Sequence, residues 1–195
     1  EQLRRWKENI LSARKFLFGS GQESGPIWLG YRTHSSSTSG DYNLIIYRKG
    51  AWVLHMLRNM LVDLKTMNED KFHHIMRKFY STYAGSEAST ADFQKVVESE
   101  MGIDMSWFFK QWILDTRIPK YTFSYMTEHT ADDKYKVTCK IEQSSVADDF
   151  QMYVPILIDF GDKGVARVRA LIKGPKAEFD LPILPMEPKR IVFND

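Results

Sequence analysis

The spacing of apolar residues changes once along the chain, at Ile118-Pro119, and this change limits the possible folds. Before it, apolar side chains recur three and four residues apart, which is the spacing of a buried helix face. After it, apolar residues alternate with polar ones, as in half-buried strands. We therefore predict an α+β chain with two domains: an antiparallel helical layer over residues 1–118 and a small β-sandwich over residues 119–195.

Caps and breakers divide the helical half. A first helix is expected over about residues 2–18, before the glycine-rich residues 19–25. The serine run at residues 35–40 is expected to be an ordered loop. Three later helices are marked by capping residues and glycine stops. These markers are Asn68 and Gly85 for one helix, Ser89 or Thr90 and Gly102 for the next, and Asp104 for the last.

The net charge, the length of the apolar runs and the cysteine count limit which partners and cross-links the chain can have. The chain has 195 residues, of which 43% are hydrophobic, and a net charge of +2. This charge is too small to indicate a nucleic-acid partner, which needs a concentrated basic face. No apolar run approaches the roughly 18 residues of a membrane span. Cys139 is the only cysteine, so no internal disulfide is possible, and the alternation around it predicts a buried strand residue.

The candidate chemistry lies in residues 40–61, where Gly40 and Asp41 open a helix. Tyr47 lies in its first turns. Its apolar stripe is predicted to comprise Ile46, Val53, Leu54, Leu57, Met60 and Leu61. From the residues alone, the favoured interpretation is a tyrosine whose ring packs in the core, with catalysis as the alternative.

The pattern Tyr-x-Lys-Gly-Ala-x-Val-Leu-x-Met-Leu-Arg at residues 47–58 resembles the aminopeptidase N family of gluzincin zinc metallopeptidases. The resemblance extends to residues 25–30, 89–93 and 107–112. In the strand half it is looser and involves Gln143, residues 153–156 and residues 179–182. The chain departs from the family at Arg117, where a glycine commonly precedes the proline of the domain junction by two residues.

The resemblance implies that Tyr47 faces a zinc site and is the one catalytic residue of this chain. In zinc peptide hydrolysis, water attacks the scissile carbonyl, and a nearby hydrogen-bond donor stabilises the negative charge that develops on the carbonyl oxygen. A phenol has an ordinary pKa of about 10 and stays protonated at neutral pH. Tyr47 is therefore the predicted donor, whereas Lys49 and Gly50 are not assigned a catalytic role.

The zinc signature itself, H-E-x-x-H followed by a further glutamate, does not occur in the sequence. The histidines are His34, His55, His73, His74 and His129, and no two of them have the required spacing. The chain does not begin with Met, so we interpret it as a piece of a longer protein whose zinc ligands and general base precede Glu1. The tripeptide Asp159-Phe160-Gly161 matches a kinase motif, but its companion motifs are missing and we attribute it to chance.

Two functions follow. In the first, the chain is part of a zinc aminopeptidase that binds peptide substrates and needs the missing upstream domains of the same chain, so that the piece alone is inactive. In the second, it is a non-catalytic scaffold or protein-interaction module derived from the peptidase fold. An intact upstream H-E-x-x-H would distinguish the first from the second.

Overall fold

The computed structural model of the protein describes residues 4, 5, 7, 8, 10, 25–34 and 41–193. The chain divides into two compact units, Glu1–Thr116 and Arg117–Asp195. The first is helical and the second consists of strands, so the predicted α+β class is confirmed. Most of the helix expected over residues 2–18, and all of the loop expected at residues 35–40, lie outside the described residues.

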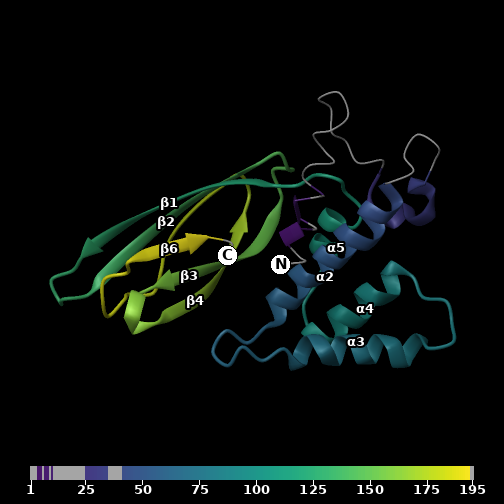
Figure 1. Ribbon diagram of the computed structural model, residues 1–195, viewed down its shortest axis with the longest axis horizontal. Coiled ribbons are helices and arrows are strands. Elements are labelled where there is room, and N and C mark those ends of the chain that lie inside the picture. The colour runs from purple at the N-terminus through teal and green to yellow at the C-terminus, as the bar shows by residue number, and fades with distance from the viewer. Residues whose placement is uncertain (1–3, 6, 9, 11–24, 35–40, 194–195) are drawn as a thin grey trace. The chain divides into compact units, whose positions relative to one another are not determined.

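From residue 25 onward, the described part of the helical unit contains a 3-10 segment, a π-helical segment and four α-helices (Figure 1). Their bounds are η1 Ile27–Thr33, η2 Asn43–Lys49, α2 Gly50–Leu61, α3 Asp70–Tyr83, α4 Thr90–Met101 and α5 Ser106–Trp112. The predicted cap of α4 is confirmed: the Ser89 side chain accepts from the backbone N–H of Asp92, and the Asp92 carboxylate accepts from that of Ser89. Gly102 ends the helix with φ of 68°, which favours glycine.

Helices α3 and α4 pack antiparallel. The Phe79 ring, late in α3, meets the Phe93 ring, early in α4, edge to face at 5.0 Å. Nearer the start of α3, His74 lies 3.0 Å from the carboxylate of Glu100, which is late in α4. Tyr80 follows Phe79 in sequence but points about 100° away from it around the helix, and it is 75% exposed.

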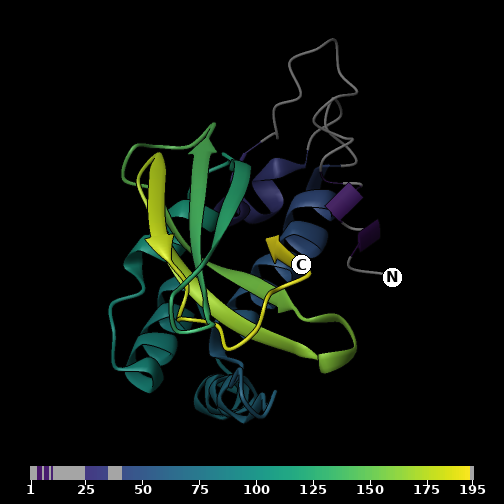
Figure 2. The ribbon, with the colours of Figure 1, turned by 90° about the vertical axis from the view of Figure 1, so that its left-hand side faces the viewer.

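In its described residues, 117–193, the second unit has six strands in two three-stranded antiparallel sheets (Figure 1; Figure 2 shows them after a quarter turn). The strands are β1 Lys120–His129, β2 Tyr135–Ser144, β3 Gln151–Asp159, β4 Val165–Lys173, β5 Lys176–Asp180 and β6 Arg190–Phe193. The sheet orders are β1-β2-β5 and β4-β3-β6. Strands β1, β5, β4 and β6 are therefore edge strands, and Pro182, Pro185 and Pro188 lie in the segment between β5 and β6.

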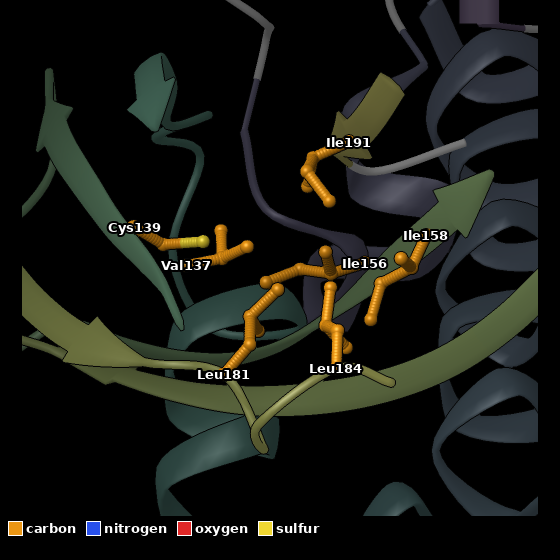
Figure 3. Packing of buried hydrophobic residues seen from close by; sticks show 7 residues of the cluster. All are labelled: Val137, Cys139, Ile156, Ile158, Leu181, Leu184 and Ile191. Atoms are coloured by element: carbon orange, nitrogen blue, oxygen red, sulfur yellow. The ribbon is translucent and has the colours of Figure 1, made fainter. Parts of the chain in front are cut away.

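Alternate side chains of the two sheets face one another and form the core of the sandwich (Figure 3). Val137 and Cys139 of β2 lie opposite Ile156 and Ile158 of β3, and all four are buried. The burial expected for Cys139 is confirmed. Burial also raises the pKa of its thiol to about 11, so this cysteine is a packing residue with little thiolate at neutral pH.

Gln143 links the two sheets near one end of the sandwich. Its buried amide nitrogen donates to the carbonyl of Phe150, just before β3, at 3.0 Å. The same nitrogen donates to the carbonyl of Gly174, after β4, at 2.5 Å. The Phe150 carbonyl also accepts from the backbone N–H of Gly174, at 2.9 Å, so Gln143 adds a second donor to it. Gln143, one of the residues that carried the looser family resemblance, therefore has a structural role in this unit.

Candidate active site

Tyr47 lies in the π-helical segment η2, which leads directly into α2. The Gly50 N–H donates to the Ile45 carbonyl, the i to i+5 bond that defines a π-turn. Such turns insert one extra residue into a helix and are frequent at functional sites. The sequence predicted a helix here, and no residue type in it signalled the change of pitch.

The π-turn moves the buried stripe by one residue. Ile45 is buried where the α-helical spacing predicted Ile46, and Leu54 is partly exposed. Val53, Leu57, Met60 and Leu61 are buried as predicted. Lys49 is also buried, with 4% of its surface exposed, and continues the stripe from Ile45 to Val53. Its burial indicates a role inside the helical unit.

Gly50 has no close neighbour that would explain it as a helix contact. Among the described residues, a Cβ at this position would meet only the Ile45 carbonyl oxygen, at 4.0 Å. Close approach of a neighbouring helix therefore does not explain the glycine at this position. Position 50 is the junction between the π-turn and α2.

The Tyr47 side chain is exposed, with 60% of its surface accessible. Its ring meets the ring of Tyr42 edge to face, with centroids 5.7 Å apart. Tyr42 in turn contacts Tyr31 of η1 at 5.5 Å. His34 stacks on Tyr31 at 5.4 Å, so the four rings form one cluster, which we call the tyrosine cluster: Tyr31, His34, Tyr42 and Tyr47.

The hydroxyls of Tyr42 and Tyr47 interact directly. A side-chain hydrogen bond to Tyr47 is the main reason why the pKa of Tyr42 lies above its ordinary value. The raised pKa favours the protonated form of Tyr42, and the hydrogen bond joins the two phenols through their hydroxyls. The sequence analysis missed Tyr42, because residues five apart lie on different faces of an ordinary α-helix.

Segment η1 supplies Tyr31 to the tyrosine cluster and is itself anchored to the end of the helical unit. The backbone N–H of Trp28 donates to the carbonyl of Ile113, which follows α5, at 3.2 Å. The Arg32 guanidinium lies 4.9 Å from the centre of the Trp28 ring, a cation–π contact. Residues 25–30, one of the stretches that carried the family resemblance, thus join the cluster to the end of the helical unit.

The histidines do not converge on a common site. Within the part of the chain that the structure describes, no three side chains of the His, Cys, Asp and Glu types are placed to hold a metal ion. Four histidines contact polar groups near them: His55 with Asn59, His73 with Glu69, His74 with Glu100, and His129 with Asp133. The described residues therefore do not form a zinc site.

Asp159 has a structural role in the turn after β3. Its carboxylate accepts from the backbone N–H of Gly161 at 2.8 Å. Its other oxygen lies 3.5 Å from the Arg190 guanidinium. The kinase-like tripeptide is thus a turn between β3 and β4, where Gly161 has φ of 69°.

Comparison with known proteins identifies the relationship. Residues 19–112, which include η1, the π-turn and α2 to α5, match the model of the Peptidase family M1 domain. Aminopeptidase N of Escherichia coli (strain K12) is 25% identical over 126 residues, which cover 62% of this chain and 13% of that protein. The chain is related to the aminopeptidase N-like metallopeptidases. The M1 peptidases are generally zinc-dependent, although the described residues of this chain show no metal site.

A solved structure supports the fold. The Legionella pneumophila aminopeptidase A, in complex with aspartic acid, superposes with a TM-score of 0.59 and 14% identity. The match covers 80% of this chain and 16% of that one. It therefore extends beyond residues 19–112 and includes part of the strand unit. The catalytic role of Tyr47 stays a prediction.

Among the described residues, no helix combines the length and the apolar character needed to cross a bilayer.

Proposed function

We propose that the chain is the C-terminal part of the catalytic helical domain, followed by the β-sandwich domain, of a zinc aminopeptidase that removes N-terminal residues from peptides. The relationship to M1 peptidases and the small share of the relatives' length that it spans support this. The zinc ligands and the general base would come from another part of the longer protein, since the described residues do not supply them. Zinc, when bound there, would activate the attacking water.

The single observation that carries the proposal is the accessible hydroxyl-bearing side chain of Tyr47 on the π-turn. It is 60% exposed and lies within the residues that match the peptidase model. A phenol buried in the core could not reach a substrate. Tyr47 is instead free to donate a hydrogen bond to the carbonyl oxygen of a bound peptide as negative charge builds there.

The hydrogen bond from Tyr47 is expected to stabilise the transition state more than the bound substrate. A neutral donor gains most where the acceptor becomes charged, because charge-assisted hydrogen bonds are about twice as strong as neutral ones. Stabilisation that grows between substrate and transition state raises kcat, whereas equal stabilisation of both lowers only KM. Tyr47 is therefore expected to act on kcat.

The proposal is tested by assaying the longer protein and the 195-residue chain side by side with an aminoacyl reporter substrate and added zinc. We expect chelator-sensitive turnover from the longer protein and none from the chain. Chelator-sensitive turnover by the chain would show that it holds its own zinc site. Absence of turnover from a folded longer protein would favour the scaffold function instead.

A further inference from the structure

Tyr42 and Tyr47 are linked through their hydroxyls at the start of the core helix. We propose that Tyr42 is a positioning residue: its hydroxyl donates to the hydroxyl oxygen of Tyr47 and orients that phenol so that its own proton points toward the substrate. The inference rests on the proposed function, since it assigns to Tyr42 a role that acts through Tyr47. Three features of the structure support it.

The first feature is the π-turn. In an α-helix, residues five apart point about 140° away from each other, so Tyr42 and Tyr47 would face different ways. In a π-turn, the hydrogen bond closes at the fifth residue, so positions five apart return to nearly the same face. The Ile45 to Gly50 bond shows this pitch at the turn that contains Tyr47. The turn therefore brings together two phenols that an α-helix would separate.

The second feature is the hydrogen bond between the two hydroxyls. A tyrosine hydroxyl has one proton to donate and accepts through its oxygen. The hydrogen bond between the two hydroxyls is the first cause of the raised pKa of Tyr42, and in the proposed arrangement Tyr42 donates its proton to the Tyr47 oxygen. Because the Tyr47 oxygen then accepts, the Tyr47 proton is left for another acceptor. A hydroxyl that accepts one hydrogen bond also donates a stronger one, since linked hydrogen bonds polarise each other.

The third feature is the support behind Tyr42. Its ring is in edge contact with Tyr47 on one side, at 82° between planes, and with Tyr31 on another, at 71°. Tyr42 is half-buried while Tyr47 is exposed. A donor whose ring is already held loses little freedom when it orients its neighbour. This is the arrangement expected of a group that supports a catalytic side chain.

Two other roles for Tyr42 predict different kinetics. If its ring only packs against Tyr47, its hydroxyl is dispensable and Tyr42→Phe leaves turnover unchanged. If its hydroxyl binds the substrate directly, Tyr42→Phe changes KM, and the loss persists when Tyr47 is already Phe. A role through Tyr47 predicts a lower kcat with KM unchanged, and no loss when the Tyr47 hydroxyl is absent.

The test is a double-mutant cycle in the longer protein, with Tyr42→Phe, Tyr47→Phe, the double variant, and Tyr80→Phe as a control on α3. We expect Tyr42→Phe to lower kcat roughly 3- to 10-fold, the range of one neutral hydrogen bond, with KM within about twofold of wild type. The double variant should match Tyr47→Phe alone. Tyr80→Phe should match the wild type, since this exposed tyrosine lies outside the tyrosine cluster.

The outcomes separate the two claims. Wild-type kcat in Tyr42→Phe, or equal losses from Tyr42→Phe in both backgrounds, would overturn the positioning role while leaving the proposed function intact if Tyr47→Phe is impaired. Wild-type activity in Tyr47→Phe would overturn the proposed function, and the positioning role with it. Circular dichroism of each variant confirms that the losses do not come from unfolding.

Discussion

Replacing Tyr47 with phenylalanine is expected to lower kcat of the longer protein by roughly 10²- to 10³-fold, the usual cost of removing one donor from an oxyanion site. The variant loses a single oxygen from an exposed side chain and keeps the ring that contacts Tyr42. KM should change little, because the lost hydrogen bond is made mainly in the transition state. Steady-state hydrolysis of an aminoacyl reporter measures both constants.

Two controls accompany this measurement. Tyr80→Phe makes the same chemical change on a helix tyrosine that is 75% exposed, and its turnover should equal that of the wild type. The zinc content and circular dichroism of Tyr47→Phe should also be those of the wild type, because the described residues around Tyr47 form no metal site. Turnover within threefold of wild type would refute the catalytic assignment.

Replacing Ile156 with alanine is expected to lower the free energy of unfolding of the chain by roughly 2–5 kcal/mol. Ile156 is fully buried in β3, where it packs between the two sheets with Val137 and Cys139 of β2 (Figure 3). The change removes apolar contacts and leaves a cavity that the two paired sheets cannot close fully. Denaturant unfolding, followed by circular dichroism, measures the loss.

Ile183 provides the matched control for Ile156. It carries the same side chain but is 53% exposed, in the proline-containing segment between β5 and β6. Ile183→Ala should therefore shift the free energy of unfolding by no more than about 0.5 kcal/mol. Equal losses in the two variants would contradict the view that the interface between the sheets is the core of this unit.

The sequence predicted those parts of the fold that depend on local periodicity. Strands β1 to β4 alternate apolar and polar residues, and each sheet buries one face, so the period of two was visible. The Ser89 cap and the Gly102 stop of α4 were visible because each involves one residue in a special geometry. These features need no knowledge of distant contacts.

The π-turn was not predictable in this way. The three- and four-residue spacing of apolar side chains in an α-helix predicts that Ile46 is buried. The extra residue of the π-turn buries Ile45 and Lys49 instead. A lysine in a buried stripe has no apolar signature. Tyr42 was missed for the same reason, since its contact with Tyr47 exists only at π-helical pitch. Tyr47 itself was selected from its resemblance to a family pattern, because an exposed tyrosine carries no periodic signal.

The central claim is that the Tyr47 hydroxyl stabilises the negative charge of the transition state, and the affinity for a tetrahedral phosphinic peptide analogue tests it most directly. Such an analogue presents a charged oxygen where the substrate has a neutral carbonyl, so its affinity should follow transition-state binding. We predict that Tyr47→Phe raises the inhibition constant of the analogue by about the factor by which it lowers kcat/KM. An unchanged inhibition constant beside a large fall in kcat/KM would contradict the claim.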